Sequence, residues 1–185
     1  MRVAAVIPAA GSGERFGGAK LRADIGGTPL IERTLGSLRE AGVDDLVLVV
    51  GPGTGTLTEA RDVTVVVNPD PSRGMFSSLQ AGLEDVIADA IVILPGDMPF
   101  VLPSTIRSLV QVFEARGGIV SPRYNGKRGH PIVVPPILQQ SVLAADPSST
   151  LHHVLRAHPE LRVDLDVDDR GVLRDVDTRE DLAHA

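Results

Sequence analysis

Short apolar runs recur along the 185-residue chain and alternate with stretches of helical spacing. The runs consist mainly of Val, Ile and Leu without polar alternation, which is typical of parallel strands covered by helices on both faces. This pattern predicts strands at Val3–Ile7, Leu46–Val50, Val63–Val67, Ala90–Leu94, Ile119–Ser121, Ile132–Val134 and Leu161–Val167.

Helical patterns lie between these runs. Thr28 and Pro29 have the form of a cap followed by a first-turn proline, and the helix they open runs to Ala41. Further helices are expected at Ser78–Asp89 and from the residue after Pro103 to Arg116. Asn-Gly at positions 125–126 marks a tight turn. Strand–helix alternation of this kind predicts an α/β sheet with right-handed crossovers, and we expect one domain over residues 1–185.

Composition and charge narrow the function. Without cysteine, the chain has no disulfides, thiolate metal sites or cysteine nucleophiles, which fits a reducing cytoplasm. No segment approaches the roughly 20 apolar residues of a membrane span, and the N-terminal apolar run is too short for a signal peptide. We therefore expect a soluble cytoplasmic protein. The net charge of −6 disfavours nucleic acid as a partner, so any phosphate site must be a local feature.

The loop after the first predicted strand is the first candidate site. Strand ends of this kind bind ligands in open α/β sheets. Small residues let backbone N–H groups approach phosphate oxygens, and the loop has five in a row: Ala9, Ala10, Gly11, Ser12 and Gly13.

Two familiar fingerprints fail in this loop. The dinucleotide motif needs a third glycine where Phe16 stands, and the Walker motif needs Gly-Lys-Ser/Thr where the chain has Gly-Ala-Lys-Leu. A simple glycine-rich turn is the alternative. The basic residues Arg15 and Lys20 favour a phosphate site over such a turn.

Two carboxylates are candidate metal ligands. Asp97 ends the predicted strand at Ala90–Leu94 and so shares a sheet edge with the N-terminal loop, although an Asp in a turn is the alternative. Thr178 and Asp181 resemble a capping box that opens a final helix. That motif leaves Asp177 as a second candidate ligand.

Three further segments carry polar side chains. Gly74–Ser78 leads into a helix, where the serines serve either as an N-cap or as a polar lip around a base. His130 is a candidate contact to an acceptor, although a lone histidine is more often structural. His152 and His153 are adjacent on a predicted helix and cannot form an i, i+4 metal pair, so we expect them on the surface.

Taken in order, six segments of the chain resemble the MobA-like nucleotidyltransferase superfamily, most closely its molybdenum cofactor cytidylyltransferases. Each segment alone is a weak signal, but together they span nearly the whole chain. They are Pro8–Gly17 with Lys20, Gly27–Leu30, Gly74–Leu79 with Ala81–Leu83, Leu94–Pro99, Gly129–Pro131, and Asp175–Thr178 with Glu180–Leu182.

The resemblance implies a Rossmann-like, three-layer α/β/α fold of the nucleotide-diphospho-sugar transferase type, with a mostly parallel sheet and a small antiparallel part. It also implies that the first loop binds a nucleoside triphosphate whose charge Arg15 and Lys20 neutralise. Asp97, joined by Asp177, would hold Mg²⁺ as the cofactor.

The resemblance also suggests the substrates. Asn68, Ser77 and Ser78 would lie near the base and sugar of the nucleotide. Ala10, within Ala-Ala-Gly, favours CTP over GTP. The implied acceptor is a phosphorylated small molecule, the molybdopterin cofactor, and a molybdoenzyme-related partner protein is compatible with it. The segment 145–150 lacks the Gly-Asp-x-Gly-like turn expected on the acceptor side, so the acceptor stays open.

The implied reaction moves CMP from CTP onto the acceptor and releases pyrophosphate. No protein nucleophile is needed, because positioning and charge stabilisation carry such transfers. The same chemistry with GTP or with another acceptor, such as a sugar phosphate, methylerythritol phosphate or a phospholactate-like acid, is the nearest alternative. A non-catalytic nucleotide-binding accessory protein is a second alternative, and Phe16 disfavours a dehydrogenase.

Overall fold

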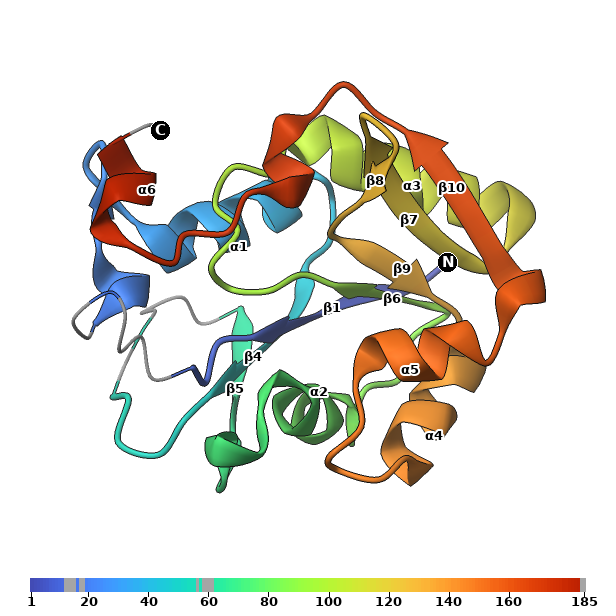
Figure 1. The fold of residues 1–185 in the computed structure, drawn as a ribbon, viewed down its shortest axis with the longest axis horizontal. Helices are drawn as coiled ribbons and strands as arrows, with labels where there is room; N and C mark the ends of the chain where they lie inside the picture. Colours follow the sequence, from blue (N-terminus) through green and yellow to red (C-terminus); the bar gives the residue numbers. More distant parts are fainter. Residues whose placement is uncertain (12–15, 17–18, 56, 58–61, 184–185) are drawn as a thin grey trace.

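The computed structural model describes residues 1–11, 16, 19–55, 57 and 62–183, and the described part has the expected α/β architecture. Within it, eight strands form one sheet in the order β10-β7-β9-β6-β1-β4-β5, with β8 attached to β7 (Figure 1). Their bounds are β1 Val3–Pro8, β4 Asp45–Val50, β5 Val63–Val67, β6 Ala90–Ile93, β7 Ile119–Tyr124, β8 Lys127–Arg128, β9 Ile132–Val134 and β10 Arg162–Asp166.

The sheet is mostly parallel. β1 runs parallel to β4 and β6, β4 to β5, and β7 to β10. The antiparallel part consists of β9, which pairs with β6 and β7, and of the β7–β8 hairpin. That hairpin turns at Asn125 and Gly126, whose φ angles are 49° and 78°, as the Asn-Gly pair predicts.

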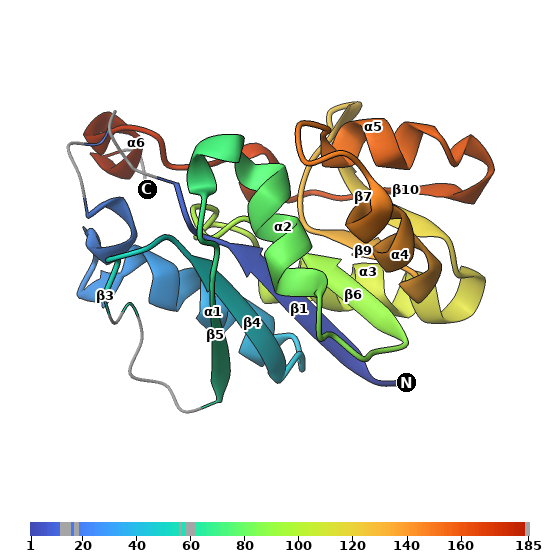
Figure 2. The ribbon, with the colours of Figure 1, turned by 90° about the horizontal axis from the view of Figure 1, so that it is seen from below.

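Helices cover both faces of the sheet, as Figures 1 and 2 show. α1 (Leu30–Glu40) and α3 (Pro103–Arg116) pack on one face; α2 (Met75–Leu83), α4 (Pro136–Ala144) and α5 (Leu151–Arg156) pack on the other. The remaining elements are α6 (Arg179–Ala183), the 3₁₀ helices η2 Lys20–Arg22, η3 Pro71–Arg73, η4 Pro159–Leu161 and η5 Arg170–Leu173, and the hairpin of β2 (Asp24–Ile25) and β3 (Thr28–Pro29). Among the described helices, none has the length and apolar character to cross a membrane.

Two apolar cores separate the sheet from its helices. Successive residues of a strand point to opposite faces, so Ile7 joins the core under α1 and α3 while Val6 joins the core under α2, α4 and α5. Burial on both faces explains why the strands read as continuous apolar runs. The three-layer arrangement implied by the resemblance is confirmed.

The start of α1 differs from the prediction. Thr28 does not cap this helix, because Thr28 and Pro29 form β3 and the helix begins at Leu30 without a side-chain cap. The preceding Gly26 and Gly27 have φ angles of 60° and 87° and turn the chain from β2 into β3. A threonine–proline pair is compatible with a short strand as well as with a helix start, so the sequence signal was ambiguous.

The bounds of α2 were also wrong. The helix spans Met75–Leu83 rather than 78–89, and it follows Gly74, whose φ is 89°. Ser77 and Ser78 therefore lie inside the first turn, and the N-cap interpretation of these serines is wrong. Past Leu83 the chain turns toward β6, where the Asp89 N–H donates to the Arg2 carbonyl at 2.8 Å.

Gly82 brings α2 close to the sheet. A Cβ added there would lie 2.5 Å from Val49 Cγ2 and 2.6 Å from Val6 Cγ1, closer than packed carbons approach. We expect Gly82→Ala to lower the free energy of unfolding by about 1–3 kcal/mol through overpacking. A Cβ added at Gly36 in α1 would have no atom within 4 Å, so Gly36→Ala should instead raise the free energy of unfolding by about 0.4–1 kcal/mol. Urea unfolding of both variants checks this, and equal stabilities would contradict the packing argument.

Candidate functional site

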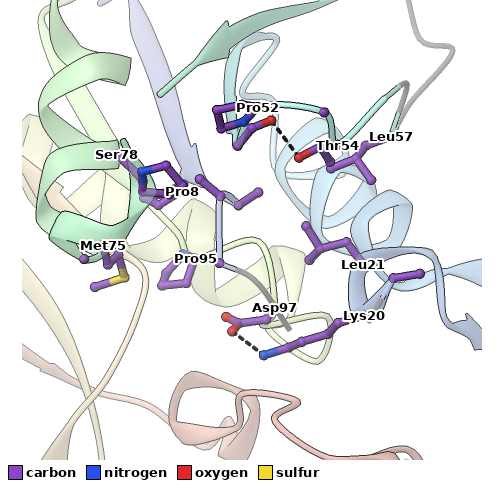
Figure 3. Close-up of a pocket in the computed structure, with 18 of the residues that line it drawn as sticks. Pro8, Lys20, Leu21, Pro52, Thr54, Leu57, Met75, Ser78, Pro95 and Asp97 are labelled. Atoms are coloured by element: carbon purple, nitrogen blue, oxygen red, sulfur yellow. Dashed lines mark hydrogen bonds and ion pairs between the residues drawn. The ribbon is translucent and has the colours of Figure 1, made fainter. Parts of the chain in front are cut away.

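The carboxyl ends of β1, β4 and β6 meet at one edge of the sheet, and a pocket of about 870 Å³ opens there (Figure 3). Open α/β sheets bind ligands at such edges, and the volume is in the range of small-molecule sites. The pocket is lined by Pro8–Gly11, Ala19–Arg22, Gly51–Thr54, Leu57, Pro71, Ser72, Gly74, Met75, Ser78, Pro95 and Asp97.

The N-terminal loop forms one wall of this pocket. Ala9, Ala10 and Gly11 line it, as the sequence predicts. The N–H group of Ala9 donates to the Val49 carbonyl at 2.8 Å, which extends the pairing of β1 with β4. In the described part of the loop, the backbone donors available to a phosphate therefore begin at Ala10.

Three predicted site residues, Ser12, Gly13 and Arg15, lie outside the described residues. Phe16, which replaces the third glycine of the dinucleotide motif, is 5% exposed. It packs in a small apolar cluster with Ile25, Leu30 and Val176. Its packing role is consistent with the failed fingerprint, because a glycine could not fill this cluster.

Asp97 lies beside the N-terminal loop, as its position after β6 predicts. The N–H of Gly96 donates to the Pro8 carbonyl at 2.9 Å. The carbonyl of Gly96 accepts a hydrogen bond of 3.1 Å from Thr34 Oγ1 in α1. A Cβ on Gly96 would lie 3.0 Å from Ala9 Cβ. A glycine before Asp97 thus lets the two loops pack directly against each other.

Lys20 joins the two candidate metal ligands. Its Nζ lies 2.8 Å from Asp97 Oδ2, as Figure 3 shows. The same Nζ lies 3.0 Å from Asp177 Oδ1, and only 13% of the Lys20 side chain is exposed. Burial by itself lowers the pKa of Lys20, but the hydrogen bonds and charges of both carboxylates outweigh it and hold the pKa above its usual value. The ammonium is therefore charged at neutral pH.

Backbone contacts hold the segment that carries Asp177 against the loop of Asp97. The N–H of Val176 donates to the Asp97 carbonyl at 2.9 Å. Asp181 accepts hydrogen bonds from the N–H groups of Asp177 and Thr178 and from the Thr178 hydroxyl, at 3.0, 2.7 and 2.9 Å. The bonds from Thr178 and then Asp177 hold the pKa of Asp181 below its usual range. The Thr178–Asp181 part of the predicted capping box is present.

Asp169 fixes the beginning of the same C-terminal segment. This side chain is 4% exposed and accepts hydrogen bonds from the Leu102 N–H at 2.9 Å, Thr105 Oγ1 at 2.7 Å and the Gly171 N–H at 2.8 Å. The segment is thereby anchored to the start of α3 before it reaches Asp177. Sequence reasoning missed this residue, because two of its partners, Leu102 and Thr105, are more than 60 positions away in the chain.

The geometry of Asp97 and Asp177 fits a hard divalent cation. Their oxygens converge on one ammonium, a position that already holds positive charge. Among the described residues, no group of three or more His, Asp or Glu could hold a metal by itself. Mg²⁺ characteristically uses one or two carboxylates and completes its coordination shell with substrate phosphates and water. Two carboxylates at a pocket of small-molecule size therefore fit a magnesium site.

Asn68, Ser77 and Ser78 form a buried hydrogen-bonded group behind the pocket. Asn68 Nδ2 donates to Ser77 Oγ at 2.9 Å and to Ser78 Oγ at 3.0 Å, and Asn68 Oδ1 accepts from the Asp70 N–H at 3.0 Å. Ser77 Oγ also donates to the Gly74 carbonyl at 2.8 Å. Of the three predicted residues, Ser78 lines the pocket, while the other two tie the end of β5 to the start of α2.

His130 lines a second pocket, of about 650 Å³, which shares Met75 with the first. Its backbone N–H donates to the Val172 carbonyl at 2.9 Å. Burial lowers the pKa of the His130 imidazole, and the charges of Asp97 and Asp175 act in the opposite direction. The structure thus places His130 near the carboxylate cluster but in a different cavity from the N-terminal loop.

The chain also matches a known family model. Residues 5–163 match the model of the MobA-like NTP transferase domain, which is most of the chain. The chain belongs to this family. The family and fold expected from the sequence are confirmed.

Relatives of this MobA-like domain are similar to it over different lengths. The probable molybdenum cofactor guanylyltransferase of Thermococcus gammatolerans is 34% identical over 60% of this chain and 56% of its own length. The molybdenum cofactor cytidylyltransferase of Escherichia coli is 26% identical over 76% of this chain and 73% of its own. The chain therefore spans little more than half of the first relative.

Solved structures of Rv0371c from Mycobacterium tuberculosis are similar over the whole domain. One has a TM-score of 0.88 and 28% identity, and the match covers 100% of this chain and 96% of the Rv0371c chain. A second, in complex with manganese, has a TM-score of 0.83 and 27% identity and covers 100% of this chain and 97% of its own.

Sequence reasoning missed one wall of the first pocket. Gly51–Thr54 follows β4 directly and lines the cavity next to the N-terminal loop. A Cβ on Gly51 would lie 3.3 Å from the Ala10 carbonyl oxygen, so the two loops are close. The signal was available: a Gly/Pro-rich loop after a parallel strand is expected at the ligand-binding edge of this domain.

The position of Lys20 between two carboxylates yields a stability prediction. Lys20→Met removes the ammonium, and the carboxylates then repel each other. In chelator-treated protein we expect a lower melting temperature than in the wild type. Added MgCl₂ or MnCl₂ should raise it by more than in the wild type, because the metal replaces the lost cation without competing against Lys20.

Lys127→Met is the matched control, since Lys127 is the only other lysine in the sequence and lies exposed in β8. It should melt like the wild type in chelator and in metal. Equal melting of Lys20→Met and Lys127→Met in chelator would show that the ammonium does not screen the carboxylates.

Proposed function

We propose that this chain is a single nucleotidyltransferase domain over residues 1–185 that transfers a nucleoside monophosphate from an NTP to a phosphorylated small-molecule acceptor, with Mg²⁺ as cofactor. The proposed donor is CTP and the proposed acceptor is the molybdopterin cofactor. An oxygen of the acceptor phosphate forms a bond to the α-phosphorus, the bond from that phosphorus to the bridging oxygen breaks, and pyrophosphate leaves.

One observation carries the proposal: the Asp97–Lys20–Asp177 cluster at a pocket formed by the ends of parallel strands. The two carboxylates are suitable ligands for a divalent cation, and the backbone N–H groups of the small residues beside them are suitable donors to a triphosphate. The manganese complex of Rv0371c supports a divalent cation in this fold. Membership of the MobA-like family supports nucleotidyl transfer as the reaction class.

The chain's own residues act by position and charge. Asp97 and Asp177 would hold the metal, which would supply neutralisation of the phosphate charge. The backbone N–H groups from Ala10 onward bind phosphate oxygens, and Lys20 is close enough to the metal ligands to stabilise charge on the departing pyrophosphate. Arg15 is assigned to the same phosphates on the sequence pattern alone.

The choice of nucleotide rests on a single residue. Ala10 lines the pocket, and its side chain in Ala-Ala-Gly favours CTP. The two relatives described above are named for guanylyl and cytidylyl transfer, so the family permits either base. Ser78, at the pocket wall next to the Asn68 amide, is the proposed contact to the nucleoside.

We expect Asp97→Ala and Lys20→Ala each to reduce pyrophosphate release by about 10²–10³-fold, because each removes an electrostatic partner of the transition state. The measurement is pyrophosphate release with Mg²⁺ and CTP, GTP, ATP or UTP in turn, with and without a molybdopterin-type acceptor. Retained folding is checked by circular dichroism.

Matched controls are Asp44→Ala and Lys127→Ala. Asp44 is exposed before β4, at the opposite edge of the sheet from the pocket, and Lys127 lies exposed in β8. Both controls should keep wild-type turnover. Near-normal turnover in Asp97→Ala would overturn the assignment. Thermal stabilisation by NTP without pyrophosphate release for any acceptor would instead indicate a non-catalytic nucleotide-binding protein.

A further inference from the structure

The second pocket has a cationic wall that the proposed nucleotide chemistry does not use. It lies on the α5 side of the sheet, where β7, β8 and β10 run side by side (Figure 1). Three arginines line it, Arg123, Arg128 and Arg162, in a chain whose net charge is −6. A local excess of guanidinium groups on an acidic protein calls for a specific cause.

Strand register explains how these side chains meet. Asp164 of β10 is aligned with Ser121 of β7, and Arg123 of β7 is aligned with Arg128 of β8. Aligned residues of neighbouring strands point to the same face, and so do residues two positions apart on one strand. Arg162 therefore faces the same side of the sheet as Ser121.

Two of the three arginines are neutralised by carboxylates. Arg128 donates two hydrogen bonds to Asp164 at 2.6 and 2.8 Å, and Arg123 donates two to Asp166 at the same distances. These bidentate pairs use the planar fork of the guanidinium. Asp164 lines the pocket, but its charge is taken up by Arg128, which holds the pKa of this carboxyl below its usual range.

Arg162 is different. Its Nη1 is buried and has no hydrogen-bond partner, and its guanidinium forms no ion pair within the described ranges. Burial lowers the pKa of Arg162, the charge of Arg128 lowers it further, and Asp164 raises it. A buried guanidinium nitrogen without a partner is rare in folded proteins, because such groups are nearly always satisfied.

Ser121 supplies a second unsatisfied group in the same pocket. Its side chain is 0% exposed, and its Oγ has no hydrogen-bond partner. The guanidinium nitrogen can only donate, and the hydroxyl can donate as well as accept, so each has a donor hydrogen without an acceptor among the described residues. Such an arrangement matches an oxyanion, which accepts several hydrogen bonds and donates none.

We propose that the second pocket is the acceptor subsite, where Arg162 and Ser121 bind the phosphate of the acceptor. The identification of the anion as the acceptor's phosphate rests on the proposed function. The location fits, because Met75 lines both pockets, so that the second pocket adjoins the proposed nucleotide site. A phosphate bound there would lie in the cavity that adjoins the nucleotide pocket at Met75.

The main test is phosphate binding by Arg162→Met. Inorganic phosphate should raise the melting temperature of the wild type. Removing a charged hydrogen-bond partner should weaken phosphate binding by about 10–100-fold in this variant. Without phosphate the variant should melt at or above the wild-type temperature, because the substitution replaces an unsatisfied buried donor with an apolar side chain. Arg116→Met, at the exposed end of α3 on the other face of the sheet, should respond to phosphate like the wild type.

Lys20→Met separates the two pockets in the same titration. Phosphate stabilisation that survives in Lys20→Met and is lost in Arg162→Met supports the acceptor subsite. Stabilisation that is lost in Lys20→Met and retained in Arg162→Met places the phosphate in the nucleotide pocket and overturns the proposal. Ser121→Ala, a smaller change, should weaken phosphate binding too, and it keeps the test decisive if Arg162→Met does not fold.

Steady-state kinetics separate the failure of this inference from that of the proposed function. With an active wild type, Arg162→Met should raise the KM for the acceptor by at least about 10-fold and leave the KM for CTP unchanged. An unchanged acceptor KM overturns the subsite while nucleotidyl transfer stands. Absence of transfer in the wild type overturns the proposed function, and the phosphate titration still decides whether Arg162 binds an oxyanion.

Discussion

The ammonium of Lys20 lies between two carboxylates that are 77 and 157 positions away in the chain. This contact connects three segments: η2 after the N-terminal loop, the loop after β6, and the C-terminal segment before α6. Most of the site's other geometry serves to bring these segments together. Gly96 packs against Ala9, Val176 bonds to the backbone of Asp97, and Asp169 anchors the C-terminal segment to α3.

The strands could be predicted from the sequence, because burial on both faces makes each one a continuous apolar run. All seven predicted runs are strands, with shifts of a few residues at their ends. Local sequence signals gave wrong predictions where the same residues are compatible with two kinds of structure. Thr28-Pro29 became a two-residue strand instead of a cap, and the helix after Gly74 began three residues before Ser78. The hairpin of β2 and β3 and the helix α4 were not predicted, because two-residue strands and weakly amphipathic helices leave little periodicity.

For the site, sequence reasoning found residues that follow strands but not the contacts between them. Asp97 was predictable from its place after a buried strand, and Asp177 from being unused by the capping box. The contact of Lys20 with both Asp97 and Asp177 was not predictable, because it depends on how the C-terminal segment folds back onto the loop after β6. The same limit applies to Arg162 and Ser121, which come together only through the register of β10 against β7. Asn68 and Ser77 were assigned to the nucleotide, but their polar groups are largely used to fix the β5–α2 connection.

The two pockets meet the same electrostatic difficulty in different ways. On the proposed function, a chain with a net charge of −6 must bind two phosphorylated substrates next to each other. Beside the first pocket, the cluster of one ammonium and two carboxylates is net negative by itself and would attract a polyphosphate once a divalent cation joins it, while Arg22 adds a positive charge to the pocket lining. In the second, three arginines face two aspartates, which leaves positive charge without a metal. On the proposed function, the carboxylate cluster contributes to nucleotide binding only with its metal, whereas the arginines of the second pocket need no metal to bind the acceptor. The free acceptor phosphate can then be held in place before its charge is brought against that of the triphosphate.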